Sequence, residues 1–229
     1  MTARRDELMR VALPLVALDA SRPIDPAVLF QNRASALWLE IGFGGGEHLA
    51  ACALAHPEEG YIGCEAFRNG VAKALMLIEE AKLRNVRLCQ GDARAIVEAL
   101  PERSLDGIYL LYPDPWPKRR HRKRRFLCDV MLTRLARIMR PGAELRFATD
   151  IDDNAGWTLV RILRSEYFSW TPESARAWQN PWEGWQGTRY EAKALRAARR
   201  PAYFTFRRNS APFERAAPNR EAALSIPKK

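Results

Sequence analysis

The chain has 229 residues, of which 47% are hydrophobic and 28% charged, as is typical of a single soluble globular domain with a sizeable core. No apolar run is long enough to cross a bilayer, and four cysteines without a CxxC pair argue against a disulfide framework or a zinc site. The formal net charge is +10, and residues 118–125 supply seven of the positive charges, so the basicity is local and indicates a phosphate-binding surface.

Apolar periodicity predicts alternating strands and helices along most of the chain. We expect strands at residues 37–41, 61–65, 86–90, 108–112, 145–149 and 202–207. Helices are expected after each of the first three strands, then from Phe126 to Pro141-Gly142, and over residues 152–166. This alternation predicts a mostly parallel sheet with helices on both faces, in a doubly wound, Rossmann-like α/β domain.

Three stretches lie outside this alternation. Residues 1–36 are expected to be helical or irregular, and the apolar run 11–18 is too short, and interrupted by Pro14, to be a signal peptide. Residues 169–188 are rich in turns and hold four tryptophans. We therefore expect one domain over residues 37–208, preceded by the segment 1–36 and followed by a flexible tail at 209–229.

A glycine-rich turn follows the first predicted strand, in the sequence Glu40-Ile41-Gly42-Phe43-Gly44-Gly45-Gly46. Counted from Gly42, the dinucleotide fingerprint G-x-G-x-x-G needs a glycine where this chain has Glu47. A helix N-terminus stabilises anions, so an acid there disfavours a bound pyrophosphate, and with it an NAD(P)-dependent oxidoreductase. The turn suits a positively charged cofactor without phosphate, such as S-adenosylmethionine.

Two acids stand at the ends of the next two predicted strands. Glu65 closes the second strand and Asp92 follows the third, and the carboxyl ends of parallel strands meet at one edge of the sheet. Glu65 is placed to accept hydrogen bonds from ribose hydroxyls, and Asp92 from an adenine amino group. Either acid alone could be an ordinary solvated strand-end carboxylate, but together with the glycine turn they predict a site for S-adenosylmethionine.

The most distinctive stretch is Pro113-Asp114-Pro115-Trp116-Pro117, directly after the strand predicted at 108–112. Proline fixes its own φ and restricts the residue before it, so Asp114 is held in a stiff loop at the ligand-binding edge of the sheet. The next eight residues include seven Lys or Arg, for which the alternative interpretation is a solvated basic face. A rigid acid beside a basic surface predicts chemistry on a polyanion.

Five stretches now occur in a recognisable order: Leu39-Glu40-Ile41-Gly42-Phe43-Gly44, Gly63-Cys64-Glu65, Tyr112 to Lys118 with Lys123-Arg124-Arg125, Ala148-Thr149-Asp150, and Thr188-Arg189-Tyr190-Glu191. Together they resemble the bacterial tRNA (guanine-N7-)-methyltransferase family over about residues 37–208. The Pro-Asp-Pro-Trp-x-Lys block is the most specific part. The N-terminal segment holds only Arg4, Arg5 and Arg10, whereas members of this family often begin with a longer basic arm.

The resemblance implies a class I methyltransferase fold with a mostly parallel seven-stranded sheet, S-adenosylmethionine as cofactor, and the variable-loop guanosine of tRNA as substrate. It implies that S-adenosylmethionine is bound by Glu40, Gly42, Gly44, Glu65 and Asp92. Asp114 is implied to be the catalytic acid and also one of the residues that bind S-adenosylmethionine. The positions that match substrate contacts are Lys118, Asp150, Thr188, Arg189, Tyr190 and Glu191. From their charge, the residues expected at RNA phosphates are Arg119, Arg120, Arg122, Lys123, Arg124 and Arg125.

Partners and location follow from the same features. We expect binding to tRNA, no membrane or metal partner, and either a monomer or a homodimer. Reduced thiols suit a cytoplasmic protein.

The chemistry suggests a role for Asp114. Guanine N7 has a free lone pair, so its methylation requires alignment and stabilisation of positive charge rather than proton removal. We expect the Asp114 carboxylate to accept hydrogen bonds from guanine N1–H and the exocyclic amino group. Asp150 and Glu191 could hold the same edge of the base, and Trp116 could either stack on a base or pack the loop.

Two other functions compete with this one. A methyltransferase acting on an exocyclic amine of DNA or RNA also uses a proline-flanked polar loop after its fourth strand, but there two prolines and an aromatic residue are expected after the polar residue, and Trp116 follows a single proline. A non-catalytic RNA-binding module could keep the same scaffold. It would have no need of the set formed by Glu40, Gly42, Gly44, Glu65 and Asp92.

Overall fold

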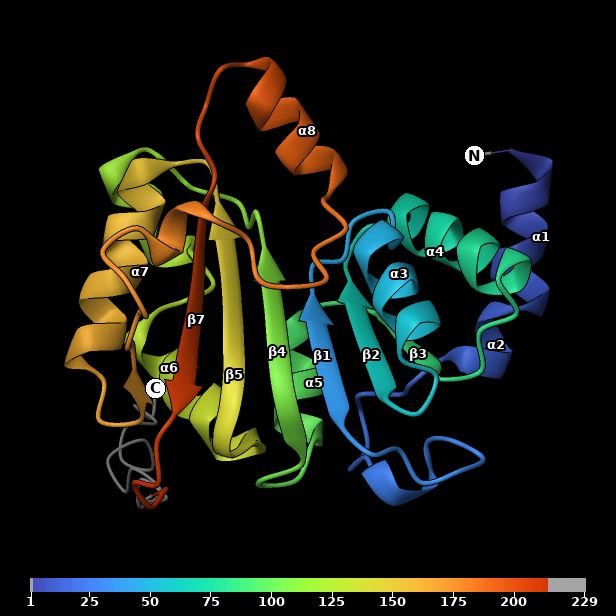
Figure 1. Cartoon of the computed structure of the whole chain (residues 1–229). Helices are drawn as coiled ribbons and strands as arrows, with labels where there is room; N and C mark the ends of the chain where they lie inside the picture. The colour runs from blue at the N-terminus through green and yellow to red at the C-terminus, as the bar shows by residue number, and fades with distance from the viewer. Residues whose placement is uncertain (1, 214–229) are drawn as a thin grey trace, which may run out of the picture.

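Seven strands form one sheet in the order β3-β2-β1-β4-β5-β7-β6 (Figure 1). The computed structural model describes residues 2–213. The strands are β1 (Leu37–Ile41), β2 (Gly60–Glu65), β3 (Val86–Gln90), β4 (Leu105–Leu111), β5 (Met139–Thr149), β6 (Phe168–Ser169) and β7 (Ala202–Arg208). Strands β1 to β5 are parallel, and β7 runs antiparallel to β5 and β6. The predicted Rossmann-like α/β fold with a mostly parallel sheet is confirmed.

Helices cover both faces of this sheet, as predicted. One face packs against α3 (Glu47–Ala55) and α4 (Arg68–Glu80), with α1 (Ala3–Val11) against α4 and the short α2 (Leu13–Val16) next to β3. The other face packs against α5 (Ala93–Ala99), α6 (Asp129–Ile138) and α7 (Asp152–Arg164). The last helix of the described residues, α8 (Arg189–Arg196), stands above the edge to which β1, β4 and β5 point (Figure 1).

Strand β4 shows how the core is divided, because successive side chains of a strand point to opposite faces. Ile108 and Leu110 join the large cluster under α5 and α6. Tyr109 and Leu111 join a smaller cluster with Tyr203, covered by tryptophans of the turn-rich segment. That segment crosses in front of β7, β5 and β4 (Figure 1), so an aromatic strap takes the place of a helix on this part of the sheet.

Two predicted boundaries are wrong. Helix α6 ends at Ile138 rather than at Pro141-Gly142, and β5 begins at Met139 rather than at residue 145. Between the pairs Leu105↔Met139 and Gly107↔Glu144 the ladder shifts register, and Pro141 and Gly142 lie in this bulge. A bulge tolerates both a proline without an N–H and a glycine at φ +87°.

Other differences concern strand and helix ends. Strand β4 begins at Leu105, which pairs with Met139, rather than at residue 108. The polar Asp106 interrupts the apolar run in the sequence, and its carboxylate accepts a hydrogen bond from the Leu37 amide at 2.8 Å. Neither β6 nor α8 was predicted. Helix α8 opens with a capping box between Thr188 and Glu191, a Thr-x-x-Glu signal that is visible in the sequence.

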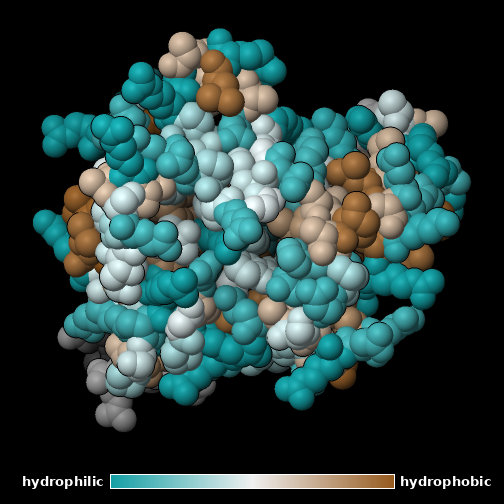
Figure 2. Space-filling model, viewed as in Figure 1, coloured by the Kyte–Doolittle hydropathy of each residue, from teal (hydrophilic) through white to brown (hydrophobic). Residues whose placement is uncertain are grey.

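The segment before β1 is helical or irregular, as predicted, and Leu8 and Met9 of α1 are buried against the first half of the sheet. In the part of the chain that the structure describes, no helix combines the length and apolar character needed to cross a membrane. Hydrophilic residues cover most of the face in Figure 2, and the hydrophobic ones form scattered patches. The predicted tail falls mostly outside the described residues.

Candidate active site

A cleft of about 460 Å³ opens at the carboxyl edge of the sheet. Gly42 lines it after β1, Glu65 at the end of β2, Asp92 after β3, and Asp114 after β4, while Tyr190 of α8 lines it from above. The strand ends thus bring together residues that are far apart in sequence, as expected for an open α/β sheet. The volume is in the range of small-molecule sites.

Glu65 braces the glycine turn of this cleft. Its side chain is buried, with Oε2 accepting from the Gly44 amide at 2.8 Å and Oε1 from the Phe67 amide at 2.9 Å. Each carboxylate oxygen can accept a further hydrogen bond. Glu65 can therefore hold the turn and accept from a pair of ligand hydroxyls at the same time.

The glycines of the turn are required by conformation and by contact. Gly42 and Gly44 have φ of +72° and +62°, a region that residues with a Cβ rarely adopt. Helix α4 closes on the turn, so that a Cβ on Gly70 would collide with the carbonyl oxygen of Gly44. The backbone of the turn is held between Glu65 and α4.

Acids also occupy the N-termini of α5 and α3 at this edge. Asp92 caps α5, accepting from the amide and from the guanidinium of Arg94 at 2.9 Å each. Burial alone would raise the pKa of Asp92, but these hydrogen bonds and the Arg94 charge outweigh it and lower the pKa. Glu47 is exposed in the first turn of α3, where it would repel a pyrophosphate.

Glu40, expected to touch the cofactor, does not line the cleft. Its buried carboxylate Oε2 lies 2.8 Å from Nδ1 of His48, which is also buried. Burial alone would lower the pKa of His48, but the Glu40 carboxylate and the hydrogen bonds to Cys52 and Glu40 outweigh it and raise this pKa to about 10. Glu40 and His48 therefore form an ion pair beneath the glycine turn.

The loop that carries Asp114 is held in an unusual backbone conformation. Tyr112 and Trp116, on either side of it, have φ of +50° and +42°. The Tyr112 amide donates to the Ala148 carbonyl of β5 at 2.7 Å. The guanidinium of Arg124 lies over the Trp116 ring at 4.8 Å, so this ring packs the loop while it also lines the cleft. Asp114 is exposed at the cleft wall.

The basic run divides into two groups. Most of it forms the 3-10 helix η2 (Arg119–Arg124). The exposed basic residues are Lys118, Arg119, Arg120, Lys123 and Arg124. Arg122 and Arg125 instead turn toward Asp153 of α7, and Arg125 is only 2% exposed. The expectation that Arg125 contacts RNA phosphate is wrong, because its guanidinium is buried among protein partners.

The segment 188–191 is also divided. Tyr190 lines the cleft, and the Arg189 guanidinium lies beside Gly44. Thr188 caps α8, and the buried Glu191 accepts from Trp185 and Tyr203. Thr188 and Glu191 thus shape the start of α8 instead of facing the cleft.

Asp150 follows β5 and does not line the same cavity as Asp114, which follows β4. Its Oδ2 accepts from Nε of Arg199 at 2.5 Å, and it lines a second cavity of about 810 Å³ between β5 and α8. The sequence-based prediction missed Arg199, His48 and the Arg125–Asp153 pair. Arg199 is 49 positions from its partner Asp150, His48 is 8 positions from Glu40, and Arg125 is 28 positions from Asp153, with no pattern in the sequence that links them.

Comparison with known proteins is consistent with a methyltransferase. A family model described as "Putative methyltransferase" matches residues 34–203. The chain is 49% identical over 206 residues to the tRNA (guanine-N(7)-)-methyltransferase of Nitrobacter winogradskyi, covering 89% of this chain and 80% of that protein. It is 48% identical over 204 residues to the protein of the same name from Brucella melitensis, covering 88% of each.

Solved structures show the same fold at low sequence identity. The 16S rRNA methyltransferase KamB aligns with a TM-score of 0.50 and 15% identity, over 76% of this chain and 89% of KamB. Phosphoethanolamine N-methyltransferase 2 of Haemonchus contortus, in complex with S-adenosyl-L-methionine, aligns with a TM-score of 0.50 and 13% identity, over 92% of this chain and 61% of that one. The predicted methyltransferase fold is confirmed.

Proposed function

Because this chain belongs to the tRNA (guanine-N7-)-methyltransferase family, we propose that it transfers a methyl group from S-adenosylmethionine to N7 of the variable-loop guanosine of tRNA. The products are N7-methylguanosine and S-adenosylhomocysteine. The observation that carries the proposal is one cleft in which Glu65, Asp92 and Asp114 meet beside an exposed basic surface.

The donors and acceptors of the cleft fit S-adenosylmethionine. Glu65 keeps acceptor capacity for the two ribose hydroxyls, and Asp92 can accept from the adenine amino group. Gly42 lets the ligand approach the turn without a side chain between them, and Glu47 disfavours a phosphate-bearing alternative by electrostatic repulsion. When bound, S-adenosylmethionine supplies an electrophilic methyl group on a sulfonium.

Asp114 is the residue that we assign to the guanine. It lines the cofactor cleft, whereas Asp150 faces the other cavity and Glu191 is buried in contacts with Trp185 and Tyr203. Its carboxylate accepts from guanine N1–H and the amino group, which orients N7 and favours the positive charge that develops on the ring. Adenine presents an acceptor at N1 and is rejected.

The exposed basic residues of the run 118–124 bind the phosphates around that guanosine. They flank the Asp114 loop, so backbone contacts there place the base over the cleft. Each phosphate neutralised by Lys or Arg releases counterions, and binding therefore weakens as salt rises. All four cysteines of the chain lie in the described part and are free, which suits an enzyme of the cytoplasm.

The test uses an unmodified tRNA transcript, the protein and labelled S-adenosylmethionine. Borohydride and aniline then cleave the RNA at N7-methylguanosine. A single cut in the variable loop is expected. Label incorporated without a cut would indicate methylation of an amine, and tRNA bound without label would indicate a binding module.

A further inference from the structure

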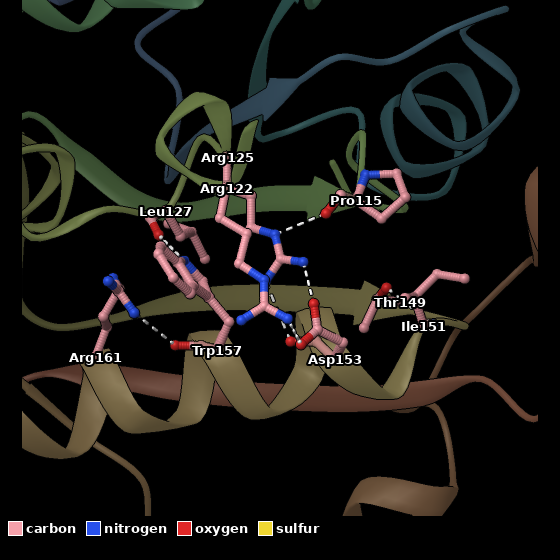
Figure 3. A network of polar contacts seen from close by, with 9 residues as sticks. All are labelled: Pro115, Arg122, Arg125, Leu127, Thr149, Ile151, Asp153, Trp157 and Arg161. Carbon is pink, nitrogen blue, oxygen red and sulfur yellow. Dashed lines mark hydrogen bonds and ion pairs between the residues drawn. The ribbon is translucent and has the colours of Figure 1, made fainter. Parts of the chain in front are cut away.

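Arg125 ends the basic run but points into the protein, as Figure 3 shows. We propose that Arg125 is a positioning residue. It holds the Asp114 loop against α7 and so fixes the position of the Asp114 carboxylate. This rests on the proposed function, in which Asp114 orients the guanine. The residue acts through the loop and does not contact tRNA.

Every nitrogen of the Arg125 guanidinium has a protein partner. Nε donates to the Pro115 carbonyl at 2.6 Å, Nη1 donates to the Asp153 carbonyl at 3.2 Å, and Nη2 pairs with the Asp153 carboxylate. The plane of the group lies over the Trp157 ring at 5.1 Å. A planar fork of fixed donors can satisfy these directions together, whereas a lysine ammonium cannot.

The Asp114 loop needs such an anchor. Tyr112 and Trp116 both adopt left-handed backbone conformations, which persist only where surrounding contacts impose them. The Tyr112 amide is tied to the Ala148 carbonyl before Asp114, and the Pro115 carbonyl is tied to Arg125 directly after it. Asp114 thus lies between two fixed points of the backbone.

The anchor also reaches the neighbouring strand end. Asp153 lies in the first turn of α7, where a helix N-terminus favours its negative charge, and it also pairs with Arg122 at 2.6 Å. Helix α7 follows directly on β5 and Asp150. Arg125 therefore connects the Asp114 loop, which follows β4, to the start of α7, which follows β5 (Figure 3). This connection fixes the position of Asp114 relative to the segment that carries Asp150.

The experiment compares two alanine variants that each remove one positive charge, at Arg125 and at the exposed Arg119. Arg125→Ala should lower kcat about 10²-fold, because misplacement by about 1 Å costs that much, with the KM for tRNA and its salt dependence unchanged. Arg119→Ala should raise this KM and reduce the salt slope by about 1 while kcat stays the same. Guanidinium chloride at low concentration should restore part of the kcat of Arg125→Ala, and sodium chloride should not.

Limited trypsin digestion without tRNA tests the anchor independently of methylation. Cleavage within residues 118–124 should be faster in Arg125→Ala than in the wild type or Arg119→Ala. If the wild type does not methylate tRNA, the proposed function fails, and digestion still shows whether Arg125 holds the loop. Where Arg125→Ala does not fold, Asp153→Asn should lower kcat and speed the same cleavage.

Two results would overturn the proposal. The first is a raised KM and a reduced salt slope in Arg125→Ala with unchanged kcat, which would make Arg125 a phosphate contact. The second is digestion at the wild-type rate in Arg125→Ala or, where that variant does not fold, in Asp153→Asn, which would show that the loop does not depend on the anchor.

Discussion

The buried ion pair of Glu40 and His48 makes stability depend on pH in a defined direction. His48 is 3% exposed, and its pKa rises from the ordinary 6.5 to about 10 because the Glu40 carboxylate and the hydrogen bonds to Cys52 and Glu40 together outweigh the effect of burial. A group whose pKa is higher in the folded state than in the unfolded state stabilises the fold. Its contribution is complete at pH values below the pKa that the group has in the unfolded chain. Here the contribution is complete below pH 6.5 and is lost as the pH rises through about 10.

Glu40→Gln keeps the shape of the side chain and removes its charge. One pKa unit corresponds to about 1.4 kcal/mol, so the wild type should exceed the variant by about 4 kcal/mol at pH 7 in free energy of unfolding. This difference should shrink by about 1.4 kcal/mol per pH unit and fall below about 1 kcal/mol by pH 10.

Urea unfolding followed by tryptophan fluorescence, at pH values from 6 to 10 and without cofactor, measures this difference. The matched control is Glu58→Gln, because Glu58 pairs with the exposed His56 at 3.6 Å. An exposed pair contributes at most about 1 kcal/mol, so that variant should stay near the wild type at every pH. A Glu40→Gln difference that is constant from pH 6 to 10 would refute the ionised pair.

Three further predictions concern the cleft and the basic surface. Asp114→Asn should lower kcat about 10²-fold or more with little change in S-adenosylmethionine affinity by calorimetry; normal turnover would remove Asp114 from the mechanism. Gly70→Ala should cost about 1–3 kcal/mol of stability and weaken cofactor binding, since the new methyl meets the Gly44 carbonyl; an unchanged Kd would show that α4 does not support the turn. Arg120→Ala should reduce the salt slope of tRNA binding by about 1, measured by filter binding, and an unaltered slope would place Arg120 outside the interface.

Local patterns were sufficient for the strand-end residues and for the order of the elements other than β6 and α8. The glycine turn follows one apolar run, and acids stand at the ends of the next runs. Because the carboxyl ends of parallel strands meet at one edge of the sheet, these residues can be placed at that edge from the sequence. Gly42, Glu65, Asp92 and Asp114 are brought together for this reason. The place of the Asp114 loop at this edge was equally readable, but the left-handed conformations of Tyr112 and Trp116 were not, because contacts with the surrounding structure impose them.

The sequence did not predict in which direction each side chain points. Arg119 and Arg125 look alike in the basic run, yet one is exposed and the other is buried against Asp153, because the packing of α7 decides which side of the run faces inward. Glu40 stands in the cofactor motif but points to His48, since alternate residues of β1 face opposite sides of the sheet.

The amino-acid sequence by itself determined the fold class, the family and the strand ends that carry the chemistry, because these depend on patterns between near neighbours in the chain. Only the tertiary structure decided which charges remain at the surface and which are paired inside. Partners such as Arg199 and Asp150 are 49 positions apart, and their contact exists only once β5 and α8 are packed in place.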